Sequence, residues 1–375
     1  LIINGAMQVA QRGTSSTSSS YGTVDRFYFA QTLLDNYALT QTQQAVTDLA
    51  GFSNSFRITT TTAESAIAAD ELAYVAQKIE AQNLQQLAYG TSSAKRVTLS
   101  FYVKSSIAGT FSTNLYQVDD NRIVNSEYTI SSANTWERKE ITYAADQTGV
   151  IDNNNGTGFY VTWNLALGSN RKGNAASAWE TQNTDNWGGA GTYTDAVITT
   201  LNATWEITGV QLEVGDVATP FEHEDFGTTL VKCQRYYQRW NATLNKDPFC
   251  MGFNNGSTVS DGIFSFPVSM RSKPSALEQS GTAGNYRIGG AAGSGNCDAV
   301  PTFSKATADF ISILSKQGVI ISKIDGAEGD DLMYAWNTEC LANDKSVIMF
   351  TGDRDLVQLV DKSTNNNTHT ILFSP

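Results

Sequence analysis

Val97-Thr98-Leu99-Ser100-Phe101-Tyr102-Val103-Lys104 is rich in β-branched and aromatic residues and alternates apolar with polar side chains for much of its length. A period of two is typical of a β-strand with one buried face. Residues 72–79 have a similar composition. Turn-forming residues separate five further strand candidates, at 110–118, 122–130, 135–143, 158–167 and 203–213. Such a series of short strands favours a β-sandwich or jelly roll.

The 375 residues are enough for two domains. Residues 1–30 contain a Ser/Thr run that cannot bury enough apolar surface to fold alone, so we expect an anchoring segment lying on a sheet. The predicted fold class is all-β: a jelly-roll β-sandwich over 31–224, a short helical linker over 225–245, and a second, smaller β-rich domain over 246–375. Within the sandwich, a helical turn is expected only at 80–88.

Charged residues make up 17% of the chain and the net charge is −12. Nucleic acid is excluded as a partner, because binding to phosphates needs clustered Lys and Arg. Membrane insertion is excluded too, because no apolar run reaches the roughly 20 residues that a span requires. A polar but thinly charged surface suits a protein that works outside a cell. Residue 1 is Leu and no secretion signal follows, so we expect the sequence to begin inside a longer gene product.

Metal and cofactor chemistry finds little support in the sequence. The four cysteines lack C-x-x-C spacing, which excludes the usual zinc patterns, and we expect free thiols, with disulfides as the alternative. Residues 119–121 and 152–156 offer oxygen ligands of the kind that Ca²⁺ takes. Turn formation explains both segments, so we expect no cofactor, with a structural calcium ion as the alternative.

Catalytic candidates are also few, so we expect the protein not to be an enzyme. His223 lies between two glutamates with no nucleophile motif near it. The acid pairs Asp330-Asp331 and Asp353-Arg354-Asp355 resemble glycosidase carboxylates only in being paired. Acid pairs in turns are usually solvated.

A loop at 168–194 breaks the strand pattern and concentrates large aromatic residues among amides and carboxylates. Aromatic faces contact the C–H groups of sugars, and amides or carboxylates bind their hydroxyl groups. The sequence therefore predicts a glycan site here, with packing beneath the loop as the alternative. Its candidate residues are Trp179, Asn183, Asp185, Asn186, Trp187 and Tyr193.

Several segments resemble phage tail-fibre and receptor-binding proteins. The first is Leu1-Ile2-Ile3-Asn4-Gly5, continuing through Gln11-Arg12-Gly13 to Val24-Asp25-Arg26-Phe27. Residues 205–222 are similar to the sequence motif that ends the jelly-roll domain in that group. Cys233-Gln234-Arg235-Tyr236-Tyr237 and residues 266–274 are similar to the start of its carboxy-terminal module. The resemblance covers residues 1–274 and stops near Glu278.

This resemblance implies a subunit on the exterior of a phage virion, a tail fibre or receptor-binding appendage with a jelly roll like a carbohydrate-binding module. Its implied partners are copies of itself in a homotrimer, other virion proteins, and a glycan of the bacterial surface. A capsid decoration or head-fibre protein, and a depolymerase of capsular polysaccharide, remain alternatives. Glycan binding after Glu278, at the far end of a fibre, is the alternative to the 168–194 loop.

Two further expectations concern packing. An Arg–Asp pair involving Arg12, Asp25 and Arg26 is expected to pin the N-terminal segment by bidentate hydrogen bonds. Trp205, Ile207, Val210 and Leu212 are expected to face a core, after one irregular step at Gly209.

Overall fold

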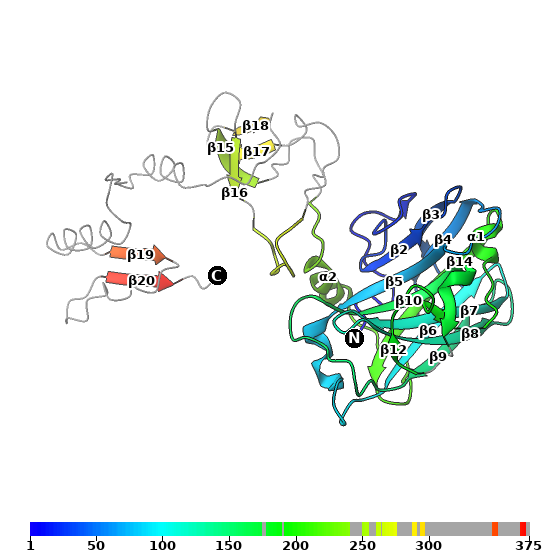
Figure 1. Cartoon of the computed structure of the whole chain (residues 1–375). Helices are drawn as coiled ribbons and strands as arrows, with labels where there is room; N and C mark the ends of the chain where they lie inside the picture. The colour runs from blue at the N-terminus through cyan, green and yellow to red at the C-terminus, as the bar shows by residue number, and fades with distance from the viewer. Residues whose placement is uncertain are drawn as a thin grey trace. The chain divides into compact units, whose positions relative to one another are not determined.

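The computed structural model groups the chain into two compact units, Leu1–Asn241 with Ser265–Gln279, and Ala242–Phe264 with Ser280–Pro375. It describes residues 1–174, 178–189, 191–240, 250–254, 260–263 and 265–275, and the short strands at 287–290, 293–296, 347–351 and 368–372. Figure 1 shows the first unit as a body of layered strands. No helix in this described part is long and apolar enough to cross a membrane.

Two antiparallel six-stranded sheets form the first unit. Sheet A has the order β1 (Ser15–Ser16), β3 (Ala38–Ala45), β4 (Asn54–Thr62), β14 (Thr204–Val214), β6 (Val97–Ser105) and β9 (Glu137–Tyr143). Sheet B has the order β12 (Glu180–Thr181), β8 (Arg122–Ile130), β7 (Gly109–Gln117), β10 (Thr157–Leu167), β5 (Leu72–Glu80) and β2 (Phe27–Thr32).

Short elements complete this unit. They are the pair β11 (Lys172–Asn174) and β13 (Gly188–Gly189), the 3-10 turns η1 (Ala81–Leu87) and η2 (Ser169–Arg171), and the helices α1 (Ala196–Thr199) and α2 (Phe226–Gln234). The predicted helical turn at 80–88 is confirmed by η1. The predicted helical segment after residue 225 is confirmed as far as α2 extends.

The strands interleave along the chain. Strands β4, β6, β9 and β14 lie together in sheet A, whereas β5, β7, β8 and β10 lie together in sheet B. This alternation between two sheets is the strand order of a jelly roll. All seven predicted strands are present as β5 to β10 and β14. Strands β2, β3 and β4 were not predicted. Strand β3 has a weak pattern, because it carries mainly Thr and Gln and has a single large apolar residue, Leu39.

One hydrophobic core fills the space between the sheets. Trp163, Trp205, Phe27 and Phe101 are fully buried within it. Trp205, Ile207, Val210 and Leu212 all belong to this core, as predicted.

The predicted irregular step in β14 is confirmed as well. The pairing of β14 with β6 shifts register between Thr208 and Gln211, and Gly209 has φ +59°. A Cβ atom at Gly209 would lie 2.7 Å from the ring of Phe52, so glycine is required there both for conformation and for space.

The N-terminal segment packs between β5 of sheet B and β14 of sheet A. The side-chain amide of Gln77 pairs with the backbone of Ile3, accepting from its N–H at 2.8 Å and donating to its carbonyl at 3.0 Å. On the other side, the backbone N–H of Val210 donates to the carbonyl of Gly5. Met7 is fully buried. The segment is therefore part of the sandwich core.

The expected Arg–Asp pair is wrong. Asp25 is instead held by Gln11, whose backbone N–H and side-chain amide both donate to its carboxylate. The guanidinium of Arg26 stacks on Tyr236 and that of Arg12 on Tyr237, each 3.4 Å from the ring centroid. Both arginines thus contact the tyrosines of the Cys233–Tyr237 motif. These tyrosines are more than 200 residues away, so the sequence pattern around the arginines could not predict the contact.

Glu80, at the end of β5, fixes the same motif to the sandwich. Its carboxylate accepts from Nε and Nη2 of Arg235 at 2.8 Å each, and from the hydroxyl of Tyr236. The backbone N–H of Arg271 donates to the carbonyl of Arg235, so residues 265–275 also join the first unit. Three of the motifs that carried the family resemblance, at 1–27, 233–237 and 266–274, therefore meet around the end of β5.

The second unit contains β15 (Cys250–Asn254), β16 (Ser260–Ile263), β17 (Arg287–Gly290) and β18 (Gly293–Asn296) in the sheet order β16-β15-β17-β18. A parallel pair joins β19 (Val347–Thr351) and β20 (Thr368–Leu372). Much of the smaller β-rich domain predicted over 246–375 lies outside the described residues. The division of the chain into four parts stays a prediction.

Candidate functional site

The outer face of sheet B gathers aromatic side chains from four strands. Residues directly opposite one another in antiparallel strands point to the same side. Tyr116, Tyr160 and Lys78 form one such row across β7, β10 and β5. The next row contains Asn114, Thr162, Ala76 and Tyr28, and the third contains Ser112, Asn164 and Tyr74. Their neighbours along each strand face the core, so these rows face outward.

Together with the loop residue Trp187, the aromatic members of these rows form a continuous series of ring contacts. The centroid of Trp187 lies 5.4 Å from that of Tyr74 and 5.7 Å from that of Tyr116. The rings of Tyr116 and Tyr160 are 5.7 Å apart, and those of Tyr74 and Tyr28 are 6.3 Å apart. The ammonium group of Lys78 bridges the remaining gap, 4.9 Å from Tyr160 and 5.2 Å from Tyr28.

We call this set the aromatic circle: Tyr28, Tyr74, Trp187, Tyr116, Tyr160 and Lys78. Tyr28 is buried and the other five members are half-buried, so the faces and edges of several rings remain accessible. Tyr21 extends the series at one side, 4.9 Å from Tyr28.

Small and polar residues occupy the middle of the circle. Thr162 lies between Asn114 and Ala76 in its row, and all three are fully buried. The Thr162 hydroxyl and the Asn114 Oδ1 atom are buried without a hydrogen-bond partner. An unpaired buried polar atom costs about 1–3 kcal/mol.

Trp187 is held on this face by the amides beneath it. Its backbone carbonyl accepts from the side chain of Asn114 at 2.8 Å, and its indole N–H donates to Oδ1 of Asn164 at 3.2 Å. In the same way the Asn186 carbonyl accepts from Asn125. The loop therefore lies across β7, β8 and β10 and delivers one tryptophan to the circle.

The circle presents hydroxyl groups that stay protonated. Burial raises the pKa of Tyr28 well above its usual value, and nearby Tyr74 and Tyr160 raise it further. Burial likewise raises the pKa of Tyr74 and of Tyr116. At any physiological pH these tyrosines are neutral hydrogen-bond donors.

Among the predicted glycan residues, Trp187 belongs to the circle and Trp179 does not. The Trp179 ring packs against Phe159 and Tyr89, and its indole N–H donates to the carbonyl of Ala144 at 2.7 Å. Packing beneath the loop, the alternative considered for these aromatics, therefore describes Trp179.

The remaining predicted residues lie along the same loop. Asn183 and Asp185 are exposed at its turn, where the backbone N–H of Asp185 donates to the Asn183 side chain. Asn186 is buried and donates to Glu180. The hydroxyl of Tyr193 donates to Glu127 of β8 at 3.1 Å. The loop thus brings one predicted ligand, Trp187, to the circle.

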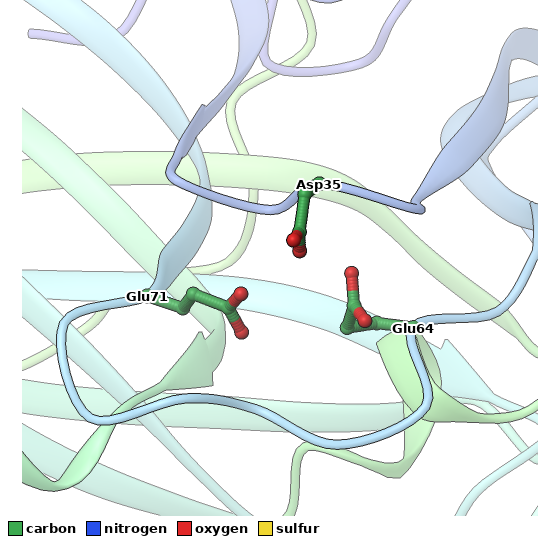
Figure 2. Close-up of side chains that lie close together, drawn as sticks. All are labelled: Asp35, Glu64 and Glu71. Carbon is green, nitrogen blue, oxygen red and sulfur yellow. The ribbon is translucent and has the colours of Figure 1, made fainter.

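A group of three carboxylates forms a second candidate site, shown in Figure 2. Asp35 lies between β2 and β3, and Glu64 and Glu71 lie between β4 and β5. Oxygen atoms of the three lie within 4.8 Å of one another, and Glu64 and Glu71 are only 3% and 4% exposed. Such oxygens could hold a hard cation such as Ca²⁺. The sequence did not predict this group, because its three residues are far apart along the chain.

Three backbone N–H groups donate to the carboxylates of this group. Glu64 accepts from the backbone N–H groups of Asn36 and Ser65, and Glu71 accepts from that of Ala68. These bonds shape the two loops. Within the described residues, no Lys or Arg forms an ion pair with the group.

The acidic turns considered for calcium bind each other instead. Asp119 accepts from the backbone N–H of Asp152, and Asp120 accepts from that of Val150. His223 packs against Phe52 and Phe221, with centroids 5.2 Å and 4.9 Å away. Cys233 is a free thiol, and burial raises its pKa. Cys297, Cys340, Asp330, Asp331, Asp353 and Asp355 lie outside the described residues.

No protein-family model and no curated protein matches the chain. Solved structures similar to it include a putative sugar binding protein from Bacteroides thetaiotaomicron, with 13% identity over 57% of this chain and 99% of that one, at a TM-score of 0.31. Another is the family 11 carbohydrate-binding module of a Clostridium thermocellum cellulase, with 10% identity over 55% of this chain and 96% of that one, at a TM-score of 0.28.

The enzymatically active domain of tailspike protein 4 from bacteriophage CBA120 is also similar, with 14% identity and a TM-score of 0.29. That match covers 50% of this chain and 19% of the tailspike chain. The chain is thus similar in structure to carbohydrate-binding β-sandwich domains and to a phage tailspike domain. At these TM-scores the similarity supports no statement about activity, ligand or site.

Proposed function

We propose that this chain binds a saccharide of the bacterial surface on the aromatic circle, as a non-enzymatic subunit on the exterior of a phage virion. The observation that carries the saccharide proposal is the circle itself. Five aromatic side chains and one ammonium group surround Thr162 and Asn114, whose side-chain oxygens have no hydrogen-bond partner. Ligand sites generally combine apolar walls with a few placed polar groups.

The circle is also built to stay in place. Its residues lie on adjacent strands of a six-stranded sheet, and Trp187 is fixed by hydrogen bonds to Asn114 and Asn164. A site on strands loses little side-chain freedom on binding, which favours affinity. Sugar rings could stack on the tyrosine and tryptophan faces while their hydroxyl groups bind tyrosine hydroxyls.

Substitution of Trp187 by alanine is expected to lower saccharide affinity at least tenfold, because a central aromatic anchor is lost. Binding would be measured by calorimetry or on an array of bacterial polysaccharides, with Tyr160→Ala as an independent second variant. The matched control is Trp136→Ala, a tryptophan that donates to Asp48 on the outer face of sheet A. Equal affinity of Trp187→Ala, Tyr160→Ala and the unchanged protein would contradict a site at the circle.

The virion part of the proposal rests on the ordered motifs of residues 1–274 and on the thinly charged, polar composition. A tail fibre or receptor-binding appendage with three copies would multiply a weak site, raising overall avidity by roughly 10²–10⁴. Immunolabelled particle images should place the protein on the tail, and a label on the head would favour a decoration role. A stable monomer by mass measurement would contradict the trimer. Release of reducing ends from host polysaccharide would contradict the non-enzymatic role.

A further inference from the structure

We propose that the saccharide bound by the aromatic circle carries a carboxylate, as in a uronic acid, and that Lys78 pairs with it. This inference rests on the proposed function and adds the chemical class of the ligand. Three observations support it: the position of Lys78 in the circle, the lack of an acidic partner for it, and the contrast with Lys104 on the opposite sheet.

Lys78 stands at the rim of the circle on β5, directly opposite Tyr160 of β10. Its ammonium group lies 4.9 Å from the Tyr160 ring centroid and 5.2 Å from that of Tyr28. Such contacts attract a cation to the negative face of an aromatic ring. They hold the half-buried ammonium beside the rings on which a sugar would stack, so little ordering remains when an anion binds.

No ion pair joins Lys78 to any Asp or Glu of the described residues. The acid nearest along its own strand and face, Glu80, is already engaged by Arg235 and Tyr236. Arg26, which directly precedes β2, donates to the backbone carbonyl of Lys78 and stacks on the ring of Tyr236. The circle therefore presents one positive charge that no neighbouring carboxylate neutralises.

Lys104 shows how the same chain treats a comparable lysine. It lies 4.7 Å from the ring of Trp136 on the outer face of sheet A, yet it pairs with Asp48 at 3.0 Å and with Glu206 at 3.7 Å. With 37 acidic and 25 basic residues, acids are available to pair with lysines. Within the part of the chain that the structure describes, Lys78 keeps its aromatic contacts and forms no ion pair, which matches a ligand that brings the carboxylate.

The guanidinium groups near the circle are engaged elsewhere, that of Arg26 on the ring of Tyr236 and that of Arg12 on the ring of Tyr237. One ammonium group fits a single negative charge better than a doubly charged phosphate, which arginine forks bind most specifically. The ligand class is therefore a carboxylated sugar. Phosphorylated polysaccharides form a separate arm of the experiment.

The experiment compares bacterial polysaccharides that contain uronic acids with the same polymers after their carboxylates have been reduced to alcohols. Phosphorylated and neutral polymers are included, and binding of the full chain is measured at low and at 0.5 M salt. We expect the acidic form of at least one polymer to bind about tenfold more tightly than its reduced form, with the difference shrinking at high salt.

Lys78→Gln should abolish this preference, Lys78→Arg should retain it, and Lys104→Gln, which removes the same charge from the other sheet, should leave it unchanged. A preference that survives in Lys78→Gln would overturn the inference, as would equal or tighter binding of the reduced or phosphorylated polymers. Binding of neutral polymers that is lost in Trp187→Ala would leave the proposed function standing while this inference fails. If no polymer binds, both fail.

Discussion

Replacing Gln77 with leucine is expected to lower the free energy of unfolding by about 2–5 kcal/mol, because two backbone groups of Ile3 lose their partner at once. Gln77 is fully buried, and its amide both accepts from and donates to Ile3. Leucine has a similar volume but neither polar group. The N–H and carbonyl of Ile3 would then remain unpaired between the two sheets.

Chemical denaturation followed by tryptophan fluorescence measures this loss directly. Limited trypsin digestion should also cut faster after Arg12, since release of Ile3 frees the N-terminal segment. The control is Gln44→Leu on β3, whose amide makes one exposed contact with the carbonyl of Ala45 and which should change stability by less than about 0.5 kcal/mol. Identical midpoints for the two variants would show that the N-terminal segment does not depend on Gln77.

Replacing Glu80 with alanine is expected to detach residues 226–240 from the sandwich, with a local loss of about 2–4 kcal/mol. The Glu80 side chain is 2% exposed and accepts from Arg235 and from Tyr236. Without it, the half-buried Arg235 charge loses its partner, and Tyr236 loses the bond that fixes it under Arg26.

Hydrogen exchange across α2 and residues 235–240 reports this opening, and we expect it to rise at least tenfold over that of the unchanged protein. The control is Glu224→Ala, which removes the exposed ion pair with Lys232 in the same segment and should have little effect. Unchanged exchange in Glu80→Ala would mean that the stacked arginines alone hold the segment.

The contacts of Glu80 with Arg235 and Tyr236 should also be sensitive to acid. Burial by itself would raise the pKa of Glu80, but hydrogen bonds from Arg235 and Tyr236 hold it below its ordinary value of 4.5. A carboxyl whose folded-state pKa is lowered contributes stability that is present above pH 4.5 and lost as the pH falls below it. Asp25 has the opposite effect on stability: burial raises its pKa, so its ionisation at higher pH destabilises the folded chain.

Hydrogen exchange of residues 226–240 should therefore increase between pH 4.5 and pH 3 relative to that of β6 in the core. Glu80→Gln should remove most of this dependence, because an amide does not titrate. A pH profile that is the same in both proteins would assign the acid sensitivity to another group.

The strands of the sandwich were predictable because their signal is local. Alternation in Val97–Ser105 and the irregular step at Gly209 follow from side chains that must reach one core. Strand β3 was not predicted because it buries Gln41 rather than a second large apolar residue. Of the glycan candidates, Trp187 joins the aromatic circle, yet nothing in the sequence distinguished it from Trp179, which packs on Phe159.

The aromatic circle could not be predicted, although each of its tyrosines is visible in the sequence. Alternation shows that Tyr116 and Tyr160 face away from the core. It does not show that β10 lies between β7 and β5, nor that Tyr160 is opposite Lys78. The group of three carboxylates in Figure 2 could not be predicted either, because their loops meet only in the folded chain.

By itself the sequence determined a mostly β sandwich, low charge and a set of ordered motifs, because period, composition and spacing are properties of neighbouring residues. Tertiary structure decided which strands are adjacent and in which register, because those pairings join residues far apart in the chain, such as Phe56 and Ile207. The contact of Glu80 with Arg235 likewise spans 155 positions. The candidate saccharide site and the contacts that join the motifs both depend on such distant pairings.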